Sequence, residues 1–368
     1  MARLAMTTTH NVGCRTLRIV SLKQIGVTAG NSKMLAIELG DREPNSTKPQ
    51  GMANDRIALI VLNYGGREDT ATCLRSLRSQ TYKDIDTIVI DNGSEDDEVS
   101  PLRAEFPAAH VVGLTTNLGF ARAVNIGLEI ANDLQSRYVL LLNNDAWLDE
   151  WPSMLAEMVK TLESDPSAGA VGPVILDALP PYRIQSAGHM YNPWTSFPKR
   201  LLSFQDRTTP IAVIYPDLLV ANCLLMQRET LNRIGAMDPD FFFYSEDFDL
   251  GLRMKEHGLR QRIVPSAFLY HYKAAKTTQF SERHIYAMLR GHLVLVSKHA
   301  RWYHWPTLAP SLAAITAGFI IYGLRRGNLS AFRGAFRAWR DFLAKRWWGF
   351  FGEPLPPVAS LAELQRHT

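Results

Sequence analysis

The sequence predicts an α/β fold with a sheet that is at least partly parallel. Three observations support this: short, continuous apolar runs recur from residue 57 onward, helical segments alternate with them, and the runs end in polar residues. The chain has 368 residues, of which 46% are hydrophobic and 21% are charged. It is therefore long enough to bury a large core and too apolar for a disordered protein.

The predicted elements follow one another in a regular order. Apolar runs at 57–62, 87–90, 110–114 and 138–142 are typical of strands that are buried on both faces. Leu74 and Leu77 fall in a helical segment between the first two runs, and a helix is expected from about Phe120 to Asn132. Strands and helices thus alternate, as they do in a domain built around a parallel sheet.

Polar side chains occur where these strands end, at Asn63, Asp91, Asn117 and Asp145. Ligands of open α/β sheets bind outside the carboxyl ends of the strands, so four such residues in series predict a binding site at one edge of the sheet. The alternative is that Asp and Asn simply favour turns and helix caps. That alternative explains a single position better than it explains four.

The sequence lacks the glycine-rich loops that usually hold phosphate groups. It has no GxxxxGK[ST] motif, and no GxGxxG follows the first strand. A phosphate-bearing ligand would therefore need another anchor, and Mg²⁺ or Mn²⁺ held by one or two carboxylates and by the ligand itself is the obvious one. Asp145, at the end of the most apolar run, is placed for that role.

A second acidic cluster lies at 238–249, after which a helix is expected to run to His257. Ser245 is a plausible N-cap of that helix, and acids in a first turn complement the helix dipole. Glu246 and Asp247 therefore have a structural explanation, but a carboxylate there could also act as a general base toward an acceptor hydroxyl. His271 closes the next extended segment, and we weigh a metal or phosphate role for it against a purely structural one.

These motifs, taken in order, resemble glycosyltransferase family 2, and in particular its rhamnosyltransferase-like branch. The resemblance covers roughly residues 57–275 and rests on Val61-Leu62-Asn63-Tyr64, Ile90-Asp91-Asn92-Gly93-Ser94, Asn117-Leu118-Gly119-Phe120, Asn143-Asn144-Asp145 and Glu246-Asp247-Phe248-Asp249. It implies a GT-A fold, in which a mixed, mostly parallel sheet is flanked by helices. It also implies a nucleotide-diphosphate sugar donor, with dTDP-rhamnose favoured, a divalent cation, and inversion at the anomeric carbon.

The resemblance also assigns roles to individual residues. Asp247 matches the catalytic base, with Glu246 beside it, whereas Asp145 and His271 match metal ligands. The donor-binding residues it implies are Asn63, Asp91, Asn117, Gly119 and Asn144. One position departs from the family's Asp-x-Asp motif, because its first acid is Asn143 here, and we therefore expect weaker metal binding.

Charge is distributed unevenly along the chain. The formal net charge is +4, yet residues 1–54 carry +4 and residues 325–346 carry +6, which leaves −6 for the remainder. An acidic middle argues against a nucleic-acid partner. The three cysteines are widely spaced and have no CxxC motif, which excludes a disulfide framework or a cysteine zinc site.

We expect three parts: a mobile N-terminal extension at 1–54, a catalytic domain at 55–280, and a helical, membrane-associating region at 281–368. Trp305–Leu324 carries no charged side chain and is long enough to cross a bilayer, and Phe332, Phe336 and Trp339 recur at helical spacing beside arginines. We favour an interfacial attachment through 305–346 over a true span or ordinary helix packing. The protein would then lie on the cytoplasmic face of the cell membrane.

A membrane-facing tail suggests a glycan or polyprenyl-linked acceptor in surface polysaccharide synthesis. Two other functions stay open on the sequence. One is a metal-dependent nucleotidyltransferase, although such an enzyme would normally show an early glycine-rich phosphate loop. The other is a catalytically silent, membrane-associated binding protein.

Overall fold

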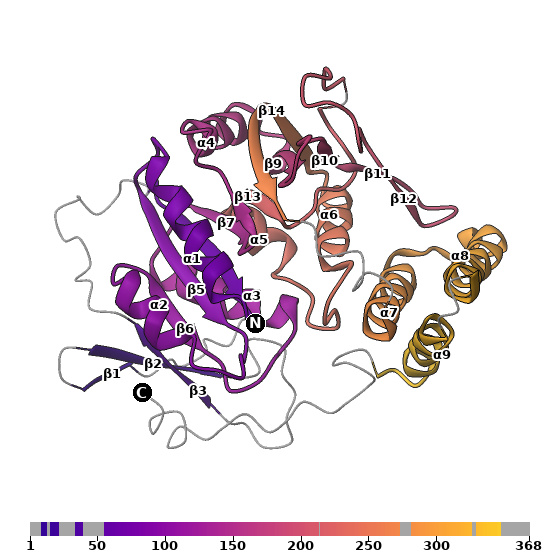
Figure 1. Cartoon of the computed structure of the whole chain (residues 1–368), viewed down its shortest axis with the longest axis horizontal. Helices are drawn as coiled ribbons and strands as arrows, with labels where there is room; N and C mark the ends of the chain where they lie inside the picture. The colour runs from indigo at the N-terminus through magenta and orange to yellow at the C-terminus, as the bar shows by residue number, and fades with distance from the viewer. Residues whose placement is uncertain are drawn as a thin grey trace.

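The computed structural model describes residues 55–212, 214–272, 281–325 and 329–346, together with three backbone strands nearer the N-terminus (Figure 1). These strands, β1 (Thr9–Val12), β2 (Arg15–Ser21) and β3 (Met34–Leu39), pair antiparallel in a small sheet. They lie within the segment predicted to be a mobile extension, and its mobility stays a prediction. The rest of that segment, the end of the predicted catalytic domain at 273–280, and the tail beyond Arg346 lie outside the described residues.

The predicted strands of the catalytic domain form one half of a large sheet. β4 (Ile57–Asn63), β5 (Ile85–Asp91), β6 (His110–Gly113) and β7 (Tyr138–Asn143) lie parallel, in the order β6-β5-β4-β7. The connecting helices are α1 (Arg67–Ser76), α2 (Val99–Glu105) and α3 (Phe120–Asp133). Because all four strands run the same way, their polar carboxyl ends meet at one edge of the sheet, as predicted.

The sheet continues through strands that the sequence analysis did not assign, apart from the extended segment ending at His271. β13 is antiparallel to both β7 and β9, whereas β14 is parallel to β9, so the sheet is mixed. The further strands are β8 (Ala146–Trp147), β9 (Ala168–Asp177), β10 (Ile184–Ser186), β13 (Cys223–Gln227) and β14 (Arg260–His271). The helices of this half are α4 (Met154–Ser164), α5 (Arg228–Ile234) and α6 (Glu246–Glu256). A separate hairpin consists of β11 (His189–Asn192) and β12 (Phe197–Arg200).

Side chains from both faces of the sheet are buried, which explains the continuous apolar runs. Along β4, Ala58 and Ile60 belong to one hydrophobic cluster with α3, whereas Leu59 and Val61 belong to a second cluster with α1 and α4. Each strand is therefore covered on both sides, and alternation of polar and apolar residues is absent from it. The predicted α/β fold with a mixed, mostly parallel sheet flanked by helices is confirmed.

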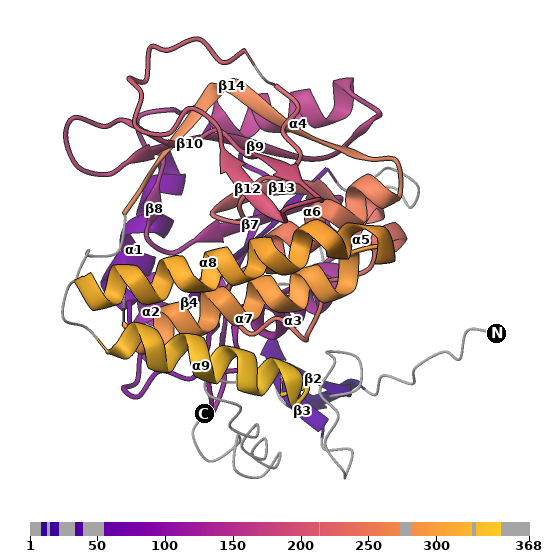
Figure 2. The same cartoon turned by 90° about the vertical axis from the view of Figure 1, so that its right-hand side faces the viewer.

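Three C-terminal helices lie side by side against one flank of the catalytic domain (Figures 1 and 2). They are α7 (Glu282–His299), α8 (Trp305–Arg325) and α9 (Ser330–Leu343). α9 presents its small residues, Ala331, Ala335 and Ala338, to the cluster it shares with α7 and α8. Phe332 and Phe336 point outward and are 52% and 61% exposed, whereas Trp339 and Phe342 pack against this cluster.

The helical segment Trp302–Arg325 is long and apolar enough to cross a membrane, with a mean hydropathy of 1.6 in its best window. Only 17% of that window is buried, although a core helix of a soluble protein is mostly buried. In the structure α8 contacts α9, and its Leu308 and Leu312 belong to the hydrophobic cluster shared with α7 and α9 (Figure 2). A long apolar C-terminal helix is therefore part of the fold.

Candidate active site

Asn63 and Asp91, from the ends of neighbouring strands, are joined by a hydrogen bond. Asn63 Nδ2 donates to Asp91 Oδ1 at 2.7 Å and also to Glu98 Oε2 at 2.5 Å, while its own Oδ1 accepts from Thr70 Oγ1 at 2.7 Å. Asn63 is completely buried and Asp91 nearly so. The backbone amides of Ser94 and Gly65 extend this network, the first to Asp91 and the second to Ser94 Oγ. The predicted pair is thus held rigidly at the edge of the sheet.

Asn117 and Gly119 form the turn that leads into α3. Asn117 Oδ1 accepts from the Gly119 amide at 2.8 Å and from Asn92 Nδ2 at 3.2 Å. Gly119 has φ +79°, and a Cβ at this position would lie 2.5 Å from the carbonyl oxygen of Phe242. Glycine is therefore required, because the turn touches the backbone of the acidic cluster. These contacts explain both residues structurally, and a direct contact with a donor stays a prediction.

The Asn143-Asn144-Asp145 segment leaves β7 at the same edge. Asn144 Nδ2 donates to Thr70 Oγ1 at 3.2 Å, which links it to the Asn63 network. Asp145 faces His271, at the end of β14, with 3.1 Å between Oδ1 and Nε2. The two come together because β8 pairs antiparallel with the last residues of β14.

The surroundings of His271 show how its ring is oriented. Nδ1 lies 2.9 Å from Gln185 Oε1, which can only accept, so Nδ1 carries the proton. Nε2 then presents its lone pair to Asn222 Nδ2 at 2.5 Å and to Asn143 Nδ2 at 3.3 Å. Asp145 Oδ1 is buried and has no hydrogen-bond partner among the described residues, although it lies close to this lone pair. Two electron-rich atoms thus face each other.

This pair fits a divalent cation that is completed by other ligands. A carboxylate oxygen and an imidazole nitrogen are both metal ligands, and their mutual repulsion is removed by a cation between them. In the described part of the chain, no group of three or more His, Cys, Asp or Glu side chains could hold a metal ion. A cation here would therefore depend on the phosphates of its substrate for further ligands, consistent with Asn143 replacing an acid.

Glu246 and Asp247 begin α6 as neighbours in a poorly hydrated place. Asp247 Oδ1 accepts from the amide of Phe248 at 2.8 Å and Oδ2 accepts from the amide of Ala221 at 3.2 Å. Glu246 is 6% exposed, and its Oε2 has no hydrogen-bond partner among the described residues. Burial raises the pKa of Asp247 to about 6, and burial together with the charge of Asp247 raises the pKa of Glu246. A carboxylate with a pKa near neutrality suits a general base.

A single dipeptide connects the two halves of the site. The amide of Ala221 holds Asp247, and the side chain of the next residue, Asn222, contacts His271. The Asn222 carbonyl also accepts from the amide of Asn143 at 2.9 Å, which ties the dipeptide to the end of β7. The segment before β13 therefore brings the candidate base, the candidate metal ligands and the Asn143–Asp145 segment together.

One expectation about the start of α6 needs correction, and one acid of the cluster has a structural role. Ser245 is the N-cap residue, but its side chain makes no capping hydrogen bond, because its backbone is left-handed with φ 73°. Asp249, which stands two residues after Asp247, is a structural acid. Its carboxylate pairs with Arg253 Nε and with His299 Nε2, each at 2.8 Å, and although burial opposes it, these partners lower the pKa of Asp249.

Several residues of the site escaped the sequence analysis. Most of their partners are distant in sequence, and none of these residues stands in one of the motifs named above. They are Thr70, Glu98, Gln185 and Asn222. The sequence contains one indirect signal for Asn222: this asparagine directly precedes the buried strand β13, much as Asn143 and Asn144 stand at the end of the buried strand β7.

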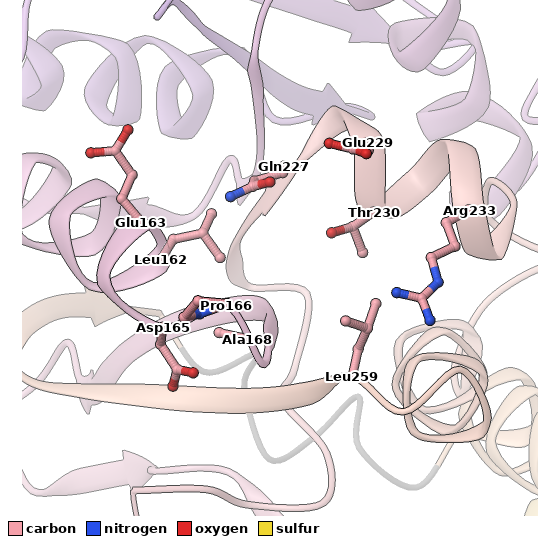
Figure 3. A pocket seen from close by; sticks show the side chains of 10 residues that line it. All are labelled: Leu162, Glu163, Asp165, Pro166, Ala168, Gln227, Glu229, Thr230, Arg233 and Leu259. Atoms are coloured by element: carbon pink, nitrogen blue, oxygen red, sulfur yellow. The ribbon is translucent and has the colours of Figure 1, made fainter.

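A cavity of about 310 Å³ lies elsewhere, between α4, α5 and the start of β14 (Figure 3). It is bordered by the carboxyl end of β13 and the amino end of β9, and β13 is antiparallel to β7. The cavity is therefore at the opposite edge of the sheet from Asn63 and Asp145. Its acidic residue Asp165 is already engaged by Ser167, Tyr215 and Arg262, so we assign this cavity no part in the site.

Comparison with known sequences agrees with this geometry. Residues 58–220 match the model of glycosyl transferase family 2. The chain is 27% identical, over 309 residues, to the N-acetylglucosaminyl-diphospho-decaprenol L-rhamnosyltransferase of Mycobacterium tuberculosis (strain H37Rv), covering 74% of this chain and 96% of that protein. It is also 27% identical over 225 residues to the O-antigen biosynthesis protein RfbC of Myxococcus xanthus, covering 59% of this chain and 17% of that protein.

Solved structures share the fold at lower sequence identity. GalNAc-T7 with UDP, GalNAc and Mn²⁺ superposes with a TM-score of 0.54 and 14% identity, covering 68% of this chain and 48% of the other. Residues 1–349 of Staphylococcus aureus TarS in complex with UDP superpose with a TM-score of 0.51 and 16% identity. The superposition covers 78% of this chain and 80% of the other. At these identities the likeness concerns the fold alone. Together, the match over residues 58–220 and the shared architecture identify the catalytic domain as a glycosyltransferase family 2 domain with the GT-A fold.

Proposed function

We propose that the protein is an inverting glycosyltransferase that moves a sugar from a nucleotide-diphosphate sugar to a hydroxyl group of a glycan or lipid-linked acceptor. The sugar we favour is rhamnose, since the Mycobacterium relative, covered over 96% of its length, is named as an L-rhamnosyltransferase. The observation that carries the proposal is the contact of Ala221 and Asn222 with Asp247 and His271. This contact joins the carboxylate of Asp247, whose pKa is raised, to the Asp145–His271 pair, which is suited to a cation.

In the proposed reaction Asp247 is the general base. It takes the proton from the acceptor hydroxyl as that oxygen attacks the anomeric carbon from the face opposite the leaving nucleoside diphosphate. One C–O bond forms while the bond to the diphosphate breaks, so the configuration inverts. The amides of Ala221 and Phe248 hold both oxygens of the Asp247 carboxylate in place.

The donor is proposed to lie at the carboxyl edge of β4 and β5. Asn63 and Asp91 would contact its base and ribose, and the Asn117–Gly119 turn and Asn144 would support the pocket. Asp145 and His271 would hold a divalent cation, Mg²⁺ or Mn²⁺. When bound, such a cation neutralises charge that develops on the departing diphosphate.

We further propose that the C-terminal helices hold the enzyme on the cytoplasmic face of the membrane. The exposed aromatic side chains of α9 lie beside Arg333, Arg337 and Arg340, a pattern suited to a surface of anionic lipid. α8 contacts α9 and shares a hydrophobic cluster with α7 and α9, which supports an attachment in the plane of the interface over a span. The acceptor would then be a polyprenyl-diphosphate glycan used in surface polysaccharide synthesis.

The proposal is tested by incubating the full chain with dTDP-, UDP- and GDP-sugars, Mg²⁺ or Mn²⁺, and an N-acetylglucosaminyl-diphospho-polyprenol in mixed micelles. We expect dTDP-rhamnose to give the glycosylated lipid and dTDP in equal amounts. Conversion of the donor to a nucleoside triphosphate and a sugar 1-phosphate when pyrophosphate is added would indicate a nucleotidyltransferase instead. Donor binding without any product, in the presence of each metal, would indicate a catalytically silent binding protein.

A further inference from the structure

Arg290 is a fully buried arginine at the centre of the C-terminal helices. It lies on α7 and is only 1% exposed. Arginine is rarely buried to this extent, because removing a guanidinium from water is costly unless its charge is compensated. The contacts of this side chain therefore require a reason.

One side of Arg290 is fixed by α9. Its Nη1 lies 3.4 Å from the hydroxyl of Tyr286, one turn earlier on α7, and that hydroxyl donates to Asp341 Oδ2 at 3.0 Å. Asp341 belongs to α9 and is completely buried, and its Oδ1 accepts from Arg340 Nε at 2.8 Å. The chain of contacts thus runs from the outer helix inward to the guanidinium.

The other side of Arg290 faces the turn that begins α6. The guanidinium carbon lies 6.0 Å from the centre of the Phe242 ring. At the next residue, Gly291, a Cβ would lie 2.3 Å from the carbonyl oxygen of Tyr244, so α7 is pressed directly against this turn. Tyr244 and Ser245 both have positive φ values there, at 72° and 73°. The residue that follows this turn is Glu246, and the positive charge of Arg290 lowers the pKa of its buried carboxyl against the effect of burial.

The charged groups around the two carboxylates support this interpretation. On α6, Asp247 and Asp249 are negative, and both raise the pKa of Glu246. On α7, Arg290 opposes them and lowers it, whereas His299 is engaged by Asp249 and Glu256. Among the described residues, Arg290 is thus the cation that acts on Glu246 from the packed neighbouring helix.

We propose that Arg290 is a positioning residue whose guanidinium, fixed by Tyr286 and Asp341, supplies the positive charge that opposes Glu246, the neighbour of Asp247. The inference rests on the proposed role of Asp247 as the base. Because Asp341 lies on α9, the anchor of this charge is on the helix proposed to contact the membrane.

The test compares Arg290→Gln and Arg290→Lys through the pH dependence of sugar transfer by the full chain. Because the two carboxylates titrate together, loss of a nearby positive charge raises their apparent pKa values. We expect Arg290→Gln to move the acid limb of the pH profile of kcat to higher pH by about one unit, while Arg290→Lys leaves this limb near the wild-type position. In a protein that already carries Glu246→Gln, adding Arg290→Gln should not shift the acid limb further. An unmoved limb, an equal shift for lysine, or a shift that persists without Glu246 would overturn the proposal.

Arg262→Gln is the matched control, because it removes an arginine paired with Asp165 away from the site and should leave the limb in place. If Arg290→Gln does not fold, Tyr286→Phe tests the proposal in its place. It removes only the hydroxyl beside Arg290, so we expect it to move the acid limb of the pH profile to higher pH by a smaller amount. An unmoved limb in that variant would overturn the proposal.

A readout without transfer separates this proposal from the proposed function. The loss of unfolding free energy in Arg290→Gln should grow as the pH rises from about 6 to about 9, since the missing charge matters only when the carboxylates ionise. A pH-independent loss would overturn the inference. If no donor gives transfer with the wild-type protein, the proposed function fails, while this measurement still tests Arg290.

Discussion

Asp145 Oδ1 and His271 Nε2 lie 3.1 Å apart, where the two-residue strand β8 pairs with the end of β14. In the neutral tautomer, with the proton on the Nδ1 that faces Gln185 Oε1, neither of these atoms is a donor. Their proximity is therefore stabilised by a positive charge, and a divalent cation supplies one where the diphosphate of a donor also binds.

Replacing Asp145 by asparagine should weaken cation binding, because the neutral amide lacks the negative charge of a preferred ligand. We expect the Mn²⁺ concentration for half-maximal transfer to rise about tenfold or more. Stabilisation of the protein by Mn²⁺ together with nucleoside diphosphate, measured by thermal unfolding, should fall in parallel. Asp149→Asn is the control, as it removes an exposed carboxylate from the same loop. Equal metal dependence in the two variants would refute the assignment.

Asp247→Asn should retain donor binding and lose transfer. The amides of Ala221 and Phe248 can still donate to the remaining carbonyl oxygen, but the side chain no longer accepts a proton. A loss of kcat of about 10² to 10⁴ is expected for a general base. Calorimetry of donor binding and a transfer assay distinguish the two effects, and turnover at the wild-type rate would exclude Asp247 as the base.

Asp249→Asn, two residues further along α6, should lower the stability of the protein rather than its catalytic rate. This carboxylate is buried between Arg253 and His299, so its neutralisation leaves two cationic partners uncompensated. We expect the free energy of unfolding to fall by about 3 kcal/mol, with donor binding retained in the folded fraction. Chemical denaturation measures the first quantity. An unchanged stability would show that this ion pair is not structural.

The pH dependence of stability should reveal the buried Glu246. Its pKa is raised on folding, so its contribution is fully present below the pKa of the unfolded chain and is lost as the pH rises through the folded value. His189 and His292, whose pKa values are lowered to about 4 by burial, act in the opposite sense. The informative quantity is therefore the unfolding free energy of the wild type minus that of Glu246→Gln. It should decrease as the pH rises from about 5 to about 8, and a constant difference would contradict the assignment.

Membrane attachment should depend on the outer face of α9. Removing the rings of Phe332 and Phe336 by substitution with serine takes away two exposed aromatic side chains without touching the buried alanines. Since burial of one such side chain stabilises by about 1.5–3 kcal/mol, vesicle binding should weaken by at least about tenfold. Flotation with vesicles containing anionic lipid measures this. Leu179→Ser, at an exposed position outside the C-terminal helices, should float like the wild type.

The sequence predicted the parallel half of the sheet well because burial on both faces leaves a strong local signal. Each run from Ile57 to Asn143 is short, apolar and closed by a polar residue, and β4, β5, β6 and β7 follow it closely. The ordered motifs also identified the family. Strands β9 and β13 were missed, because β13 pairs with β7 and β9, and β9 pairs with β14, which are distant along the chain.

The site was predicted as a set of positions, but its contacts were not. Nothing near Asn222 or Gln185 in the sequence indicates that both bind the ring of His271. Likewise, the apolar period of α7 suggests a core helix and conceals the buried charge of Arg290. Local patterns report which residues end a strand. They do not report which residues from remote segments will meet there.

The Ala221–Asn222 dipeptide also limits how the protein can move during a reaction cycle. Adjacent Cα atoms across a trans peptide are fixed at about 3.8 Å, so the amide that holds Asp247 and the side chain that contacts His271 begin at neighbouring backbone positions. Rotation of the Asn222 side chain is the freedom that remains, and a cation on His271 would use it by displacing this side chain. The backbone on which both halves of the site depend is thus a single covalent link.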